Sequence, residues 1–224
     1  KGIGDVRLSE YIRQGGGDKL RARCGGGVLV TLAVGAHHRH LFETLCRENW
    51  SRYAARYGYD LIPFFDPLDQ SARAGSRSPA WQKCLVLEQP EVRAYRQVVW
   101  IDSDILLNPE TAPCVCTGVP EGRIGGVDAY GIPTRAHFTG ILERLYGVWR
   151  QRGVRFVDNL TPERFYSNRG LVPLADVIHT GVMVASPALH AGLFRRAYDQ
   201  YEEMGSAEWN YEMGFLSWVL VQAG

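Results

Sequence analysis

Several features that would assign this 224-residue chain to other classes of protein are scarce or missing. Its formal net charge is +1 and its longest basic cluster is Arg21 to Arg23, which argues against nucleic-acid binding through bulk electrostatics. No apolar run approaches the roughly 18 residues of a membrane-spanning helix, and the N-terminus has no signal peptide. We therefore expect no nucleic-acid partner and no membrane span in this chain.

Cysteine is also sparse, with five residues, an odd number that does not suit a framework of disulfides. Cys46 and Cys84 lie in apolar, helix-like patterns, where free cysteine behaves as a small buried hydrophobe. Cys114 and Cys116 are too closely spaced for a zinc site of the usual spacing. We expect a reducing compartment and a cytoplasmic location, or the Golgi lumen if an upstream anchor has been removed.

The pattern of apolar residues predicts alternating strands and helices. Residues 1–27 are charged and glycine-rich and predict an irregular lead-in. Residues 28–34 predict a buried strand, an amphipathic helix follows and stops at Gly58, and residues 59–65 predict a second strand. This β-α-β unit indicates an α/β sheet with parallel strands, in which ligands bind beyond the carboxyl ends of the strands.

The rest of the chain continues this alternation. Ser78 and Pro79 supply a helix N-cap and first-turn proline, which predicts a helix over 79–89 after a polar loop at 66–78. The remaining predicted elements are strands at 97–102, 123–127 and 181–185 and helices at 141–151, 187 to about 204, and 209–221. Residues 152–177 have no clear pattern.

Two carboxylates follow the strand at 97–102, one residue apart. Asp102 and Asp104 end an apolar run, where a charge is costly unless a cation or hydrogen-bond donors compensate it. Hard divalent cations do this with oxygen ligands. The competing interpretation is that both carboxylates cap the strand end by binding turn amides.

Together with its neighbours, this motif is similar to the GT-A nucleotide-sugar glycosyltransferases, most closely the galactosyl/mannosyl/xylosyltransferase family 34. The likeness spans residues 28 to 220 and predicts a Rossmann-like GT-A fold with a mixed, mainly parallel sheet flanked by helices. It implies one catalytic domain over 28–224, with a nucleotide-binding half at 28–109 and an acceptor-side half at 110–224. The segments that carry it are Thr31 to Gly35, Tyr53 to Asp60, Pro79 to Lys83, Val99 to Asp104 with Asn108-Pro109, and His179 to Met183.

The resemblance implies a metal-dependent transfer of a hexose or pentose from a nucleotide diphosphate sugar to an acceptor hydroxyl, with retention of configuration. Mn²⁺ or Mg²⁺ would bind Asp104 directly, and Asp102 would meet the ribose or the metal. The residues implied in donor binding are Thr31, Ala33, Val34, Gly35, Lys83, Asp102 and Ser103, and those implied on the side of a carbohydrate or other hydroxyl acceptor are His179, Thr180 and Gly181.

Two catalytic residues are expected, Glu212 and Lys83. Lys83 is one of only three lysines and would reach a phosphate or sugar hydroxyl, whereas the competing interpretation is a surface residue that covers Trp81. Glu212 lies at the start of a late helix, where it would flank the anomeric carbon or only complement the helix dipole. Met213 stands where the family has Gln or a second acid.

The sequence leaves the third metal ligand and two other functions open. The family completes its metal site with a His-Gly pair near the C-terminus, and no histidine follows Leu220; His38 or His40 would contact a diphosphate or lie on the surface. One alternative is a haloacid dehalogenase-type phosphatase, although Ile105 and the lack of a lysine after Lys83 oppose it. The other is an inactive sugar- or nucleotide-binding module. The oligomeric state is not encoded in any motif found.

Overall fold

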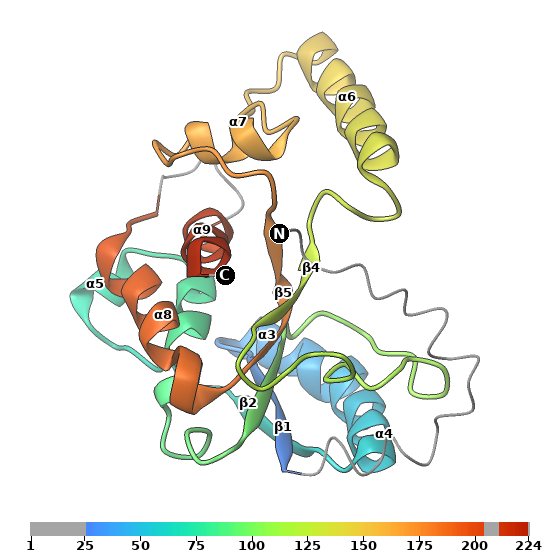
Figure 1. Cartoon of the computed structure of the whole chain (residues 1–224), viewed down its shortest axis with the longest axis vertical. Helices are drawn as coiled ribbons and strands as arrows, with labels where there is room; N and C mark the ends of the chain where they lie inside the picture. The colour runs from blue at the N-terminus through green and yellow to red at the C-terminus, as the bar shows by residue number, and fades with distance from the viewer. Residues whose placement is uncertain (1–25, 204–210, 224) are drawn as a thin grey trace.

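The central element of the computed structural model, which describes residues 26–203 and 211–223, is a five-stranded sheet of order β2-β1-β3-β5-β4 (Figure 1). Strands β2, β1 and β3 are parallel, and β5 pairs antiparallel with both β3 and β4. Four strands therefore run in one direction, which confirms the predicted mixed, mainly parallel α/β fold. The strands are β1 Gly27–Leu32, β2 Asp60–Phe64, β3 Gln97–Ile101, β4 Gly125–Asp128 and β5 Ile178–Ala185.

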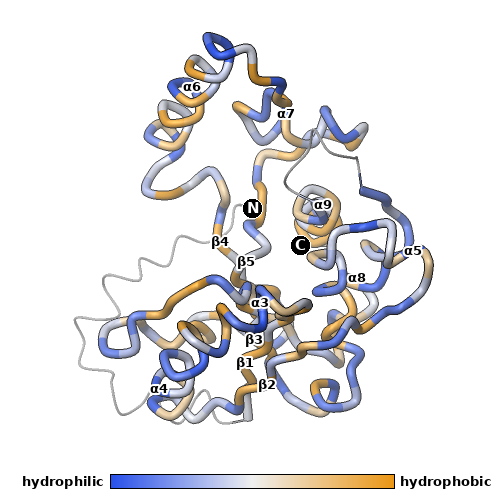
Figure 2. The backbone as a smooth tube through the Cα atoms, turned by 180° about the vertical axis from the view of Figure 1, so that it is seen from behind, coloured by the Kyte–Doolittle hydropathy of each residue, from blue (hydrophilic) through white to orange (hydrophobic). Residues whose placement is uncertain are grey.

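Helices cover both faces of this sheet. Alternate residues of β1 and β3 point to opposite faces, so Val28 and Val98 pack with one set of helices and Leu29 and Val99 with the other. Figure 2 shows the hydrophobic strands between these layers. The helices are α3 Ala36–Leu41, the π-helical η1 Phe42–Cys46, α4 Arg47–Tyr57, α5 Ala72–Gly75, the 3₁₀ helix η2 Pro79–Glu88, α6 Arg135–Gln151, α7 Pro162–Ser167, α8 Pro187–Gln200 and α9 Met213–Ala223.

Local signals in the sequence set several helix ends. Gly58 ends α4 with φ 74° and donates its N–H to the Ala54 carbonyl at 2.8 Å. The Ser78 hydroxyl accepts a hydrogen bond from the Ala80 N–H, and Pro79 opens η2. Both ends agree with the sequence. The 3₁₀ geometry of η2 was not foreseen, because residues 81–87 are buried on all sides and show no one-sided pattern.

The structure corrects several predicted boundaries. α6 begins at Arg135, six residues before the predicted start, because Thr134 caps it by accepting the His137 N–H. β5 begins at Ile178 rather than at residue 181, and α8 ends at Gln200 rather than near residue 204. α5 lies within the predicted loop at 66–78. The predicted start of the last helix at residue 209 and nearly all of the lead-in at 1–27 lie outside the described residues.

α6 and α7 form an arm beyond the carboxyl edge of the sheet (Figure 1). β4 runs parallel to β3, so the chain leaves β4 at this edge, builds the arm and returns through β5. The arm has its own small core of Tyr130, Phe165, Tyr166 and Val177. Both predicted halves of the chain thus contribute strands to one sheet, while their division at residue 109 stays a prediction.

Candidate functional site

A cavity of about 520 Å³ lies beyond the carboxyl ends of β1 and β3. β5 runs antiparallel to β3, so its first residues border the cavity. The prediction that the C-terminal end of this strand would border the cavity is therefore wrong. The volume suits a small-molecule ligand. The residues that line it are Leu32, Val34, His38, Ser78, Pro79, Ala80, Lys83, Trp100, Asp102, Ser103, Asp104, His179, Thr180, Tyr211, Glu212 and Met213.

Most of the predicted site residues meet in this cavity. Those that do not line it are Thr31, Ala33, Gly35 and Gly181. Thr31 and Ala33 are fully buried inside the fold, so any contact they make with a ligand would run through the backbone. Gly35 has φ 90° and precedes α3, a conformation that a residue with a side chain rarely adopts.

Lys83 is the centre of a buried charge network. Its Nζ lies 2.8 Å from Glu212 Oε1 and 2.9 Å from Asp102 Oδ1, and its side chain is 5 % exposed. Burial alone would lower the pKa of Lys83, but the two carboxylates outweigh it and raise that pKa above its ordinary value. Lys83 is therefore a buried cation that holds two acidic side chains from different elements together, and the interpretation as a surface residue is wrong.

The network extends to β5 and to Trp100. Thr180 donates its hydroxyl to Glu212 Oε1 at 2.8 Å and its carbonyl lies 3.4 Å from Lys83 Nζ. The Trp100 indole N–H donates to Asp102 Oδ1 at 2.8 Å. Sequence reasoning missed Trp100, although its position two residues before Asp102 on the same strand face was a usable signal.

Gly181 brings β5 directly against the Asp pair. The Asp102 N–H donates to the Gly181 carbonyl at 2.8 Å. A Cβ added at Gly181 would lie 2.8 Å from a ring carbon of His179 and 3.2 Å from Asp102 Oδ2. The predicted acceptor-side residues therefore lie beside the predicted metal ligands.

Asp104 differs from Asp102 in its surroundings. It is exposed in the cavity and forms no hydrogen bond or ion pair with any described residue. Asp102 Oδ2 likewise has no hydrogen bond with the part of the chain that the structure describes, since both contacts above involve Oδ1. A carboxylate without a protein partner beside a second free oxygen suits a hard cation that also binds phosphate oxygens and water. Within residues 26–203 and 211–223, no group of three or more His, Cys, Asp or Glu side chains is placed to hold a metal.

Tyr211 and His38 also line the cavity. Tyr211, which precedes Glu212, has φ 41°, an uncommon value for a residue other than glycine. His38 lies on α3, directly after the end of β1. The sequence had left His38 between a diphosphate contact and a surface position, and the structure places it in the cavity wall.

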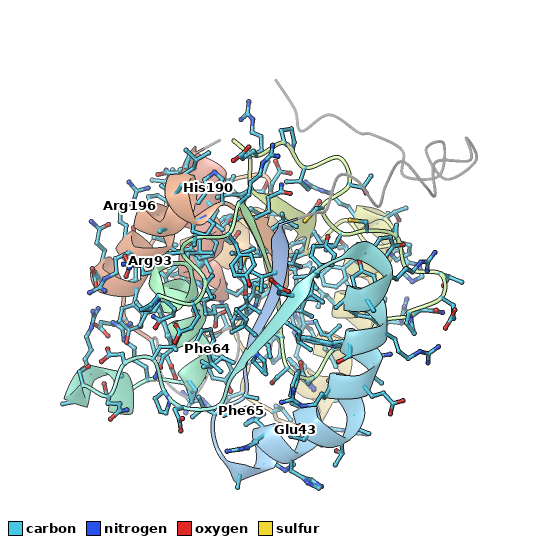
Figure 3. All side chains as sticks on the ribbon, turned by 90° about the horizontal axis from the view of Figure 1, so that it is seen from below. Glu43, Phe64, Phe65, Arg93, His190 and Arg196 are labelled. Atoms are coloured by element: carbon cyan, nitrogen blue, oxygen red, sulfur yellow. The ribbon has the colours of Figure 1, made fainter. Side chains whose placement is uncertain are left out.

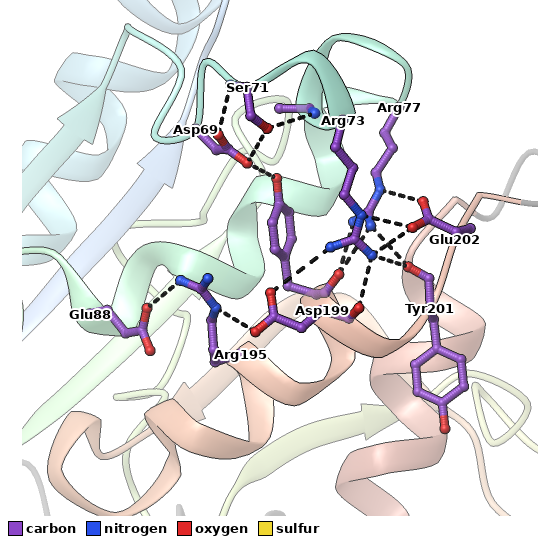
Figure 4. A network of polar contacts seen from close by, with 11 residues as sticks. Asp69, Ser71, Arg73, Arg77, Glu88, Arg195, Asp199, Tyr201 and Glu202 are labelled. Carbon is purple, nitrogen blue, oxygen red and sulfur yellow. Dashed lines mark hydrogen bonds and ion pairs between the residues drawn. The ribbon is translucent and has the colours of Figure 1, made fainter.

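Two arginines of the loop at 66–78 connect the wall of the cavity to the end of α8 (Figure 4). Arg77 donates to the carbonyls of Tyr198 and Tyr201 at the end of α8 and pairs with Glu202 at 2.9 Å. Arg73 joins the same carboxylate at 2.7 Å. Since Ser78 directly follows Arg77, this cluster fixes the start of η2, the element that carries Lys83.

The cysteines do not take part in this site. Cys46, Cys84 and Cys116 are free and buried, which agrees with the prediction for the first two. Cys114 is disulfide-bonded. Among the helices of the described residues, none has the length and apolar character needed to span a membrane.

Comparison with known proteins adds a fold-level likeness. No protein-family model matches the sequence, and no curated protein matches it. A similar solved structure is a glycosyltransferase involved in the glycosylation of the major capsid of PBCV-1. It is 13 % identical, the match covers 83 % of this chain and 71 % of that chain, and the TM-score is 0.45. A likeness at this level does not establish a shared activity, so the function has to be argued from the geometry of the site.

Proposed function

We propose that this protein is a metal-dependent glycosyltransferase that moves a hexose or pentose from a nucleotide diphosphate sugar to an acceptor hydroxyl. One observation carries the proposal: two free carboxylate positions, Asp104 and Asp102 Oδ2, open into a ligand-sized cavity at the carboxyl edge of parallel strands. This edge is where α/β sheets bind nucleotides. Four of the five segments that resemble the GT-A transferases contribute residues to the lining of this cavity, namely Thr31 to Gly35, Pro79 to Lys83, Val99 to Asp104 and His179 to Met183.

In the proposed complex, the donor enters across the end of β1. Val34 and the backbone at Gly35 would contact the base and ribose, and Ser103 would lie between the two carboxylates that face the diphosphate. Asp104 and Asp102 Oδ2 would hold Mn²⁺ or Mg²⁺, with phosphate oxygens and water as the remaining ligands. When bound, the cation would neutralise charge on the leaving diphosphate as a Lewis acid.

Lys83 would act mainly by positioning. An ammonium group has three N–H donors, and Asp102, Glu212 and the Thr180 carbonyl supply three acceptors. In this arrangement no N–H remains for a phosphate. Lys83 would therefore turn Asp102 so that Oδ2 faces the cation, and would hold the Glu212 carboxylate beside the sugar, where it stabilises positive charge at the anomeric carbon.

On the other side of the sugar, the acceptor would approach β5. His179 is exposed and Thr180 lines the cavity, so both can contact an acceptor hydroxyl. Retention of configuration is part of the proposal and rests on the resemblance to family 34.

Turnover of nucleotide sugars tests the proposal. We expect slow release of nucleoside diphosphate from one member of a panel of nucleotide sugars, in the presence of Mn²⁺ and not in EDTA. Asp104→Asn should lower this rate by about 100-fold or more, because even outer-shell partners of a metal are worth about 10 to 100-fold. Glu91→Gln, an exposed carboxylate outside the cavity, is the matched control and should turn over normally.

The two competing functions give different results in the same assays. Release of inorganic phosphate from simple phosphate esters would identify a phosphatase. Tight nucleotide binding with no turnover of any nucleotide sugar would identify an inactive binding module. Either result would contradict the proposed transferase.

A further inference from the structure

The arm formed by α6 carries an exposed apolar face. Four of the ten large apolar side chains that are exposed in the described residues fall between residues 132 and 154. Ile141 is 39 % exposed and Val148 is 40 % exposed, and they lie seven residues apart, on the same face of α6. Ile132 and Val154 flank the helix at its two ends and are 57 % and 46 % exposed.

Other apolar side chains of α6 are already used. Phe138 packs edge-on against Tyr130, with ring centroids 5.3 Å apart, and Tyr146 stacks on Phe156 at 4.7 Å. These contacts attach the helix to the arm. Ile141 and Val148, in contrast, belong to none of the hydrophobic clusters of the described residues.

The segment around α6 has a surplus of positive charge. Residues 134–156 contain five arginines and one acidic residue, in a chain whose net charge is only +1. Arg135 is paired with Asp128 and Asp176, and Arg150 lies over the Phe156 ring. Arg144 and Arg152 are exposed and form no ion pair with any described residue. Their spacing from Ile141, three and eleven residues, places both on its face.

We propose that α6 binds the surface of an anionic lipid bilayer. The exposed side chains belong to an arm that protrudes from the sheet (Figure 1), and the surplus of arginine around them complements an anionic surface. Ile141 and Val148 enter below the headgroups, while the long arginine side chains reach the lipid phosphates.

Co-sedimentation of the full chain with vesicles tests this proposal independently of any enzymatic activity. We expect binding to phosphatidylcholine vesicles that contain about one-third phosphatidylserine, weaker binding to pure phosphatidylcholine, and a decrease with added salt. Arg144→Gln with Arg152→Gln should weaken binding by about 25-fold, since each basic side chain near an anionic surface contributes a factor of about five.

Matched control variants test whether binding depends on this face of α6 or on any exposed arginine or apolar side chain. Arg93→Gln with Arg196→Gln removes the same charge from two exposed arginines outside the arm (Figure 3) and should leave binding within about twofold of the control. Ile141→Ser with Val148→Ser should weaken binding several-fold, whereas Leu45→Ser with Leu189→Ser, also exposed, should not. Circular dichroism confirms that each variant is folded.

Two results would overturn the proposal. One is the absence of binding to the anionic vesicles, or binding that the α6 variants do not change. The other is a dimer in sedimentation velocity that Ile141→Ser with Val148→Ser dissociates while vesicle binding persists, which would show that a second copy of the chain covers this face.

Discussion

The most consequential residue is Lys83, because it neutralises two acidic side chains in a place where water does not reach it. Its partners come from three elements: Asp102 follows β3, Thr180 lies in β5, and Glu212 precedes α9. The Glu212 side chain is only 3 % exposed, so its charge is acceptable only while Lys83 is present. The same residue therefore links the stability of the fold to the geometry of the site.

Lys83→Met should lower the free energy of unfolding by about 3–5 kcal/mol, because it leaves Glu212 as an uncompensated buried charge. Adding Glu212→Gln should recover part of this loss, since the amide keeps an acceptor for the Thr180 hydroxyl without the charge. Urea unfolding of Lys83→Met, Glu212→Gln and the double variant measures the free energy of unfolding of each. A double variant as unstable as the sum of both single variants would show that the pair is not coupled.

Arg96→Met provides the matched control for this comparison. Arg96 pairs with Glu121 at 2.7 Å, but its side chain is 69 % exposed. A solvated pair of this kind contributes about 1 kcal/mol or less. The difference between Lys83→Met and Arg96→Met therefore measures the effect of burial.

At the scale of elements, α8 is held at its C-terminal end by groups from elsewhere. Its last carbonyls receive Arg77 and Arg73 from the loop at 66–78, although the helix has no basic residue in its own last turn. These contacts connect α8 to η2 and so to Lys83. At its start the contact is local, because the Ser186 N–H donates to His190 Nδ1 at 2.9 Å within the same helix.

Arg77→Met should destabilise the protein by about 2–4 kcal/mol, because it removes a buried cation from two carbonyls and a carboxylate. Arg73→Met, which removes a side chain that is 34 % exposed from the same cluster, should cost about 1 kcal/mol or less. Thermal unfolding of the two variants gives the comparison. Equal losses would show that burial of Arg77 does not decide its contribution.

His190 should make the stability depend on pH. Burial lowers the pKa of His190, against a smaller effect of a backbone hydrogen bond with Gly122, so the folded protein keeps the ring neutral. A lowered pKa means that the contribution is present above the ordinary value of about 6.5 and is lost as the pH falls through the folded value. The free energy of unfolding should therefore decrease below about pH 6.5.

His190→Asn tests this dependence, because the amide oxygen can still accept the Ser186 N–H but does not titrate. Its stability should change less with pH over this range than that of the unsubstituted protein. His40→Asn, at an exposed histidine, should leave the pH profile as it was. An unchanged profile in His190→Asn would assign the acid sensitivity to other groups.

Elements were predictable where a local signal fixes them, and not where distant segments do. The Gly58 stop and the Ser78-Pro79 start are encoded within a few residues, and both are present in the structure. Thr161-Pro162 carries the same kind of start signal for α7 and was overlooked. The antiparallel direction of β5 and the contact of Lys83 with Glu212 depend on pairing between segments far apart in the sequence, which no local pattern reveals.

For the whole molecule, the mixed sheet explains why the site is compact. Because β5 runs against β3, its first residues rather than its last reach the edge where Asp102 and Asp104 lie. The acceptor-side residues are thereby brought next to the proposed metal ligands without a long loop. The Asp pair, Glu212 and Lys83 could all be proposed from sequence as site residues, whereas the contacts of Lys83 with both Asp102 and Glu212 required the folded chain.

Binding of a nucleoside diphosphate with Mn²⁺ should therefore stabilise the whole fold, since the ligand would bridge β1, β3 and the arginine-anchored wall. At a concentration 100 times the Kd, the expected stabilisation is about 2.7 kcal/mol, or about 5 to 10 °C in Tm for a chain of this length. Asp104→Asn or EDTA should abolish the shift, and Glu91→Gln should retain it. A shift that persists in EDTA and in Asp104→Asn would contradict a cation held by the Asp pair while leaving nucleotide binding itself intact. Differential scanning fluorimetry with each nucleotide in turn would also identify the base, because only the preferred nucleotide would reach saturation at low concentration.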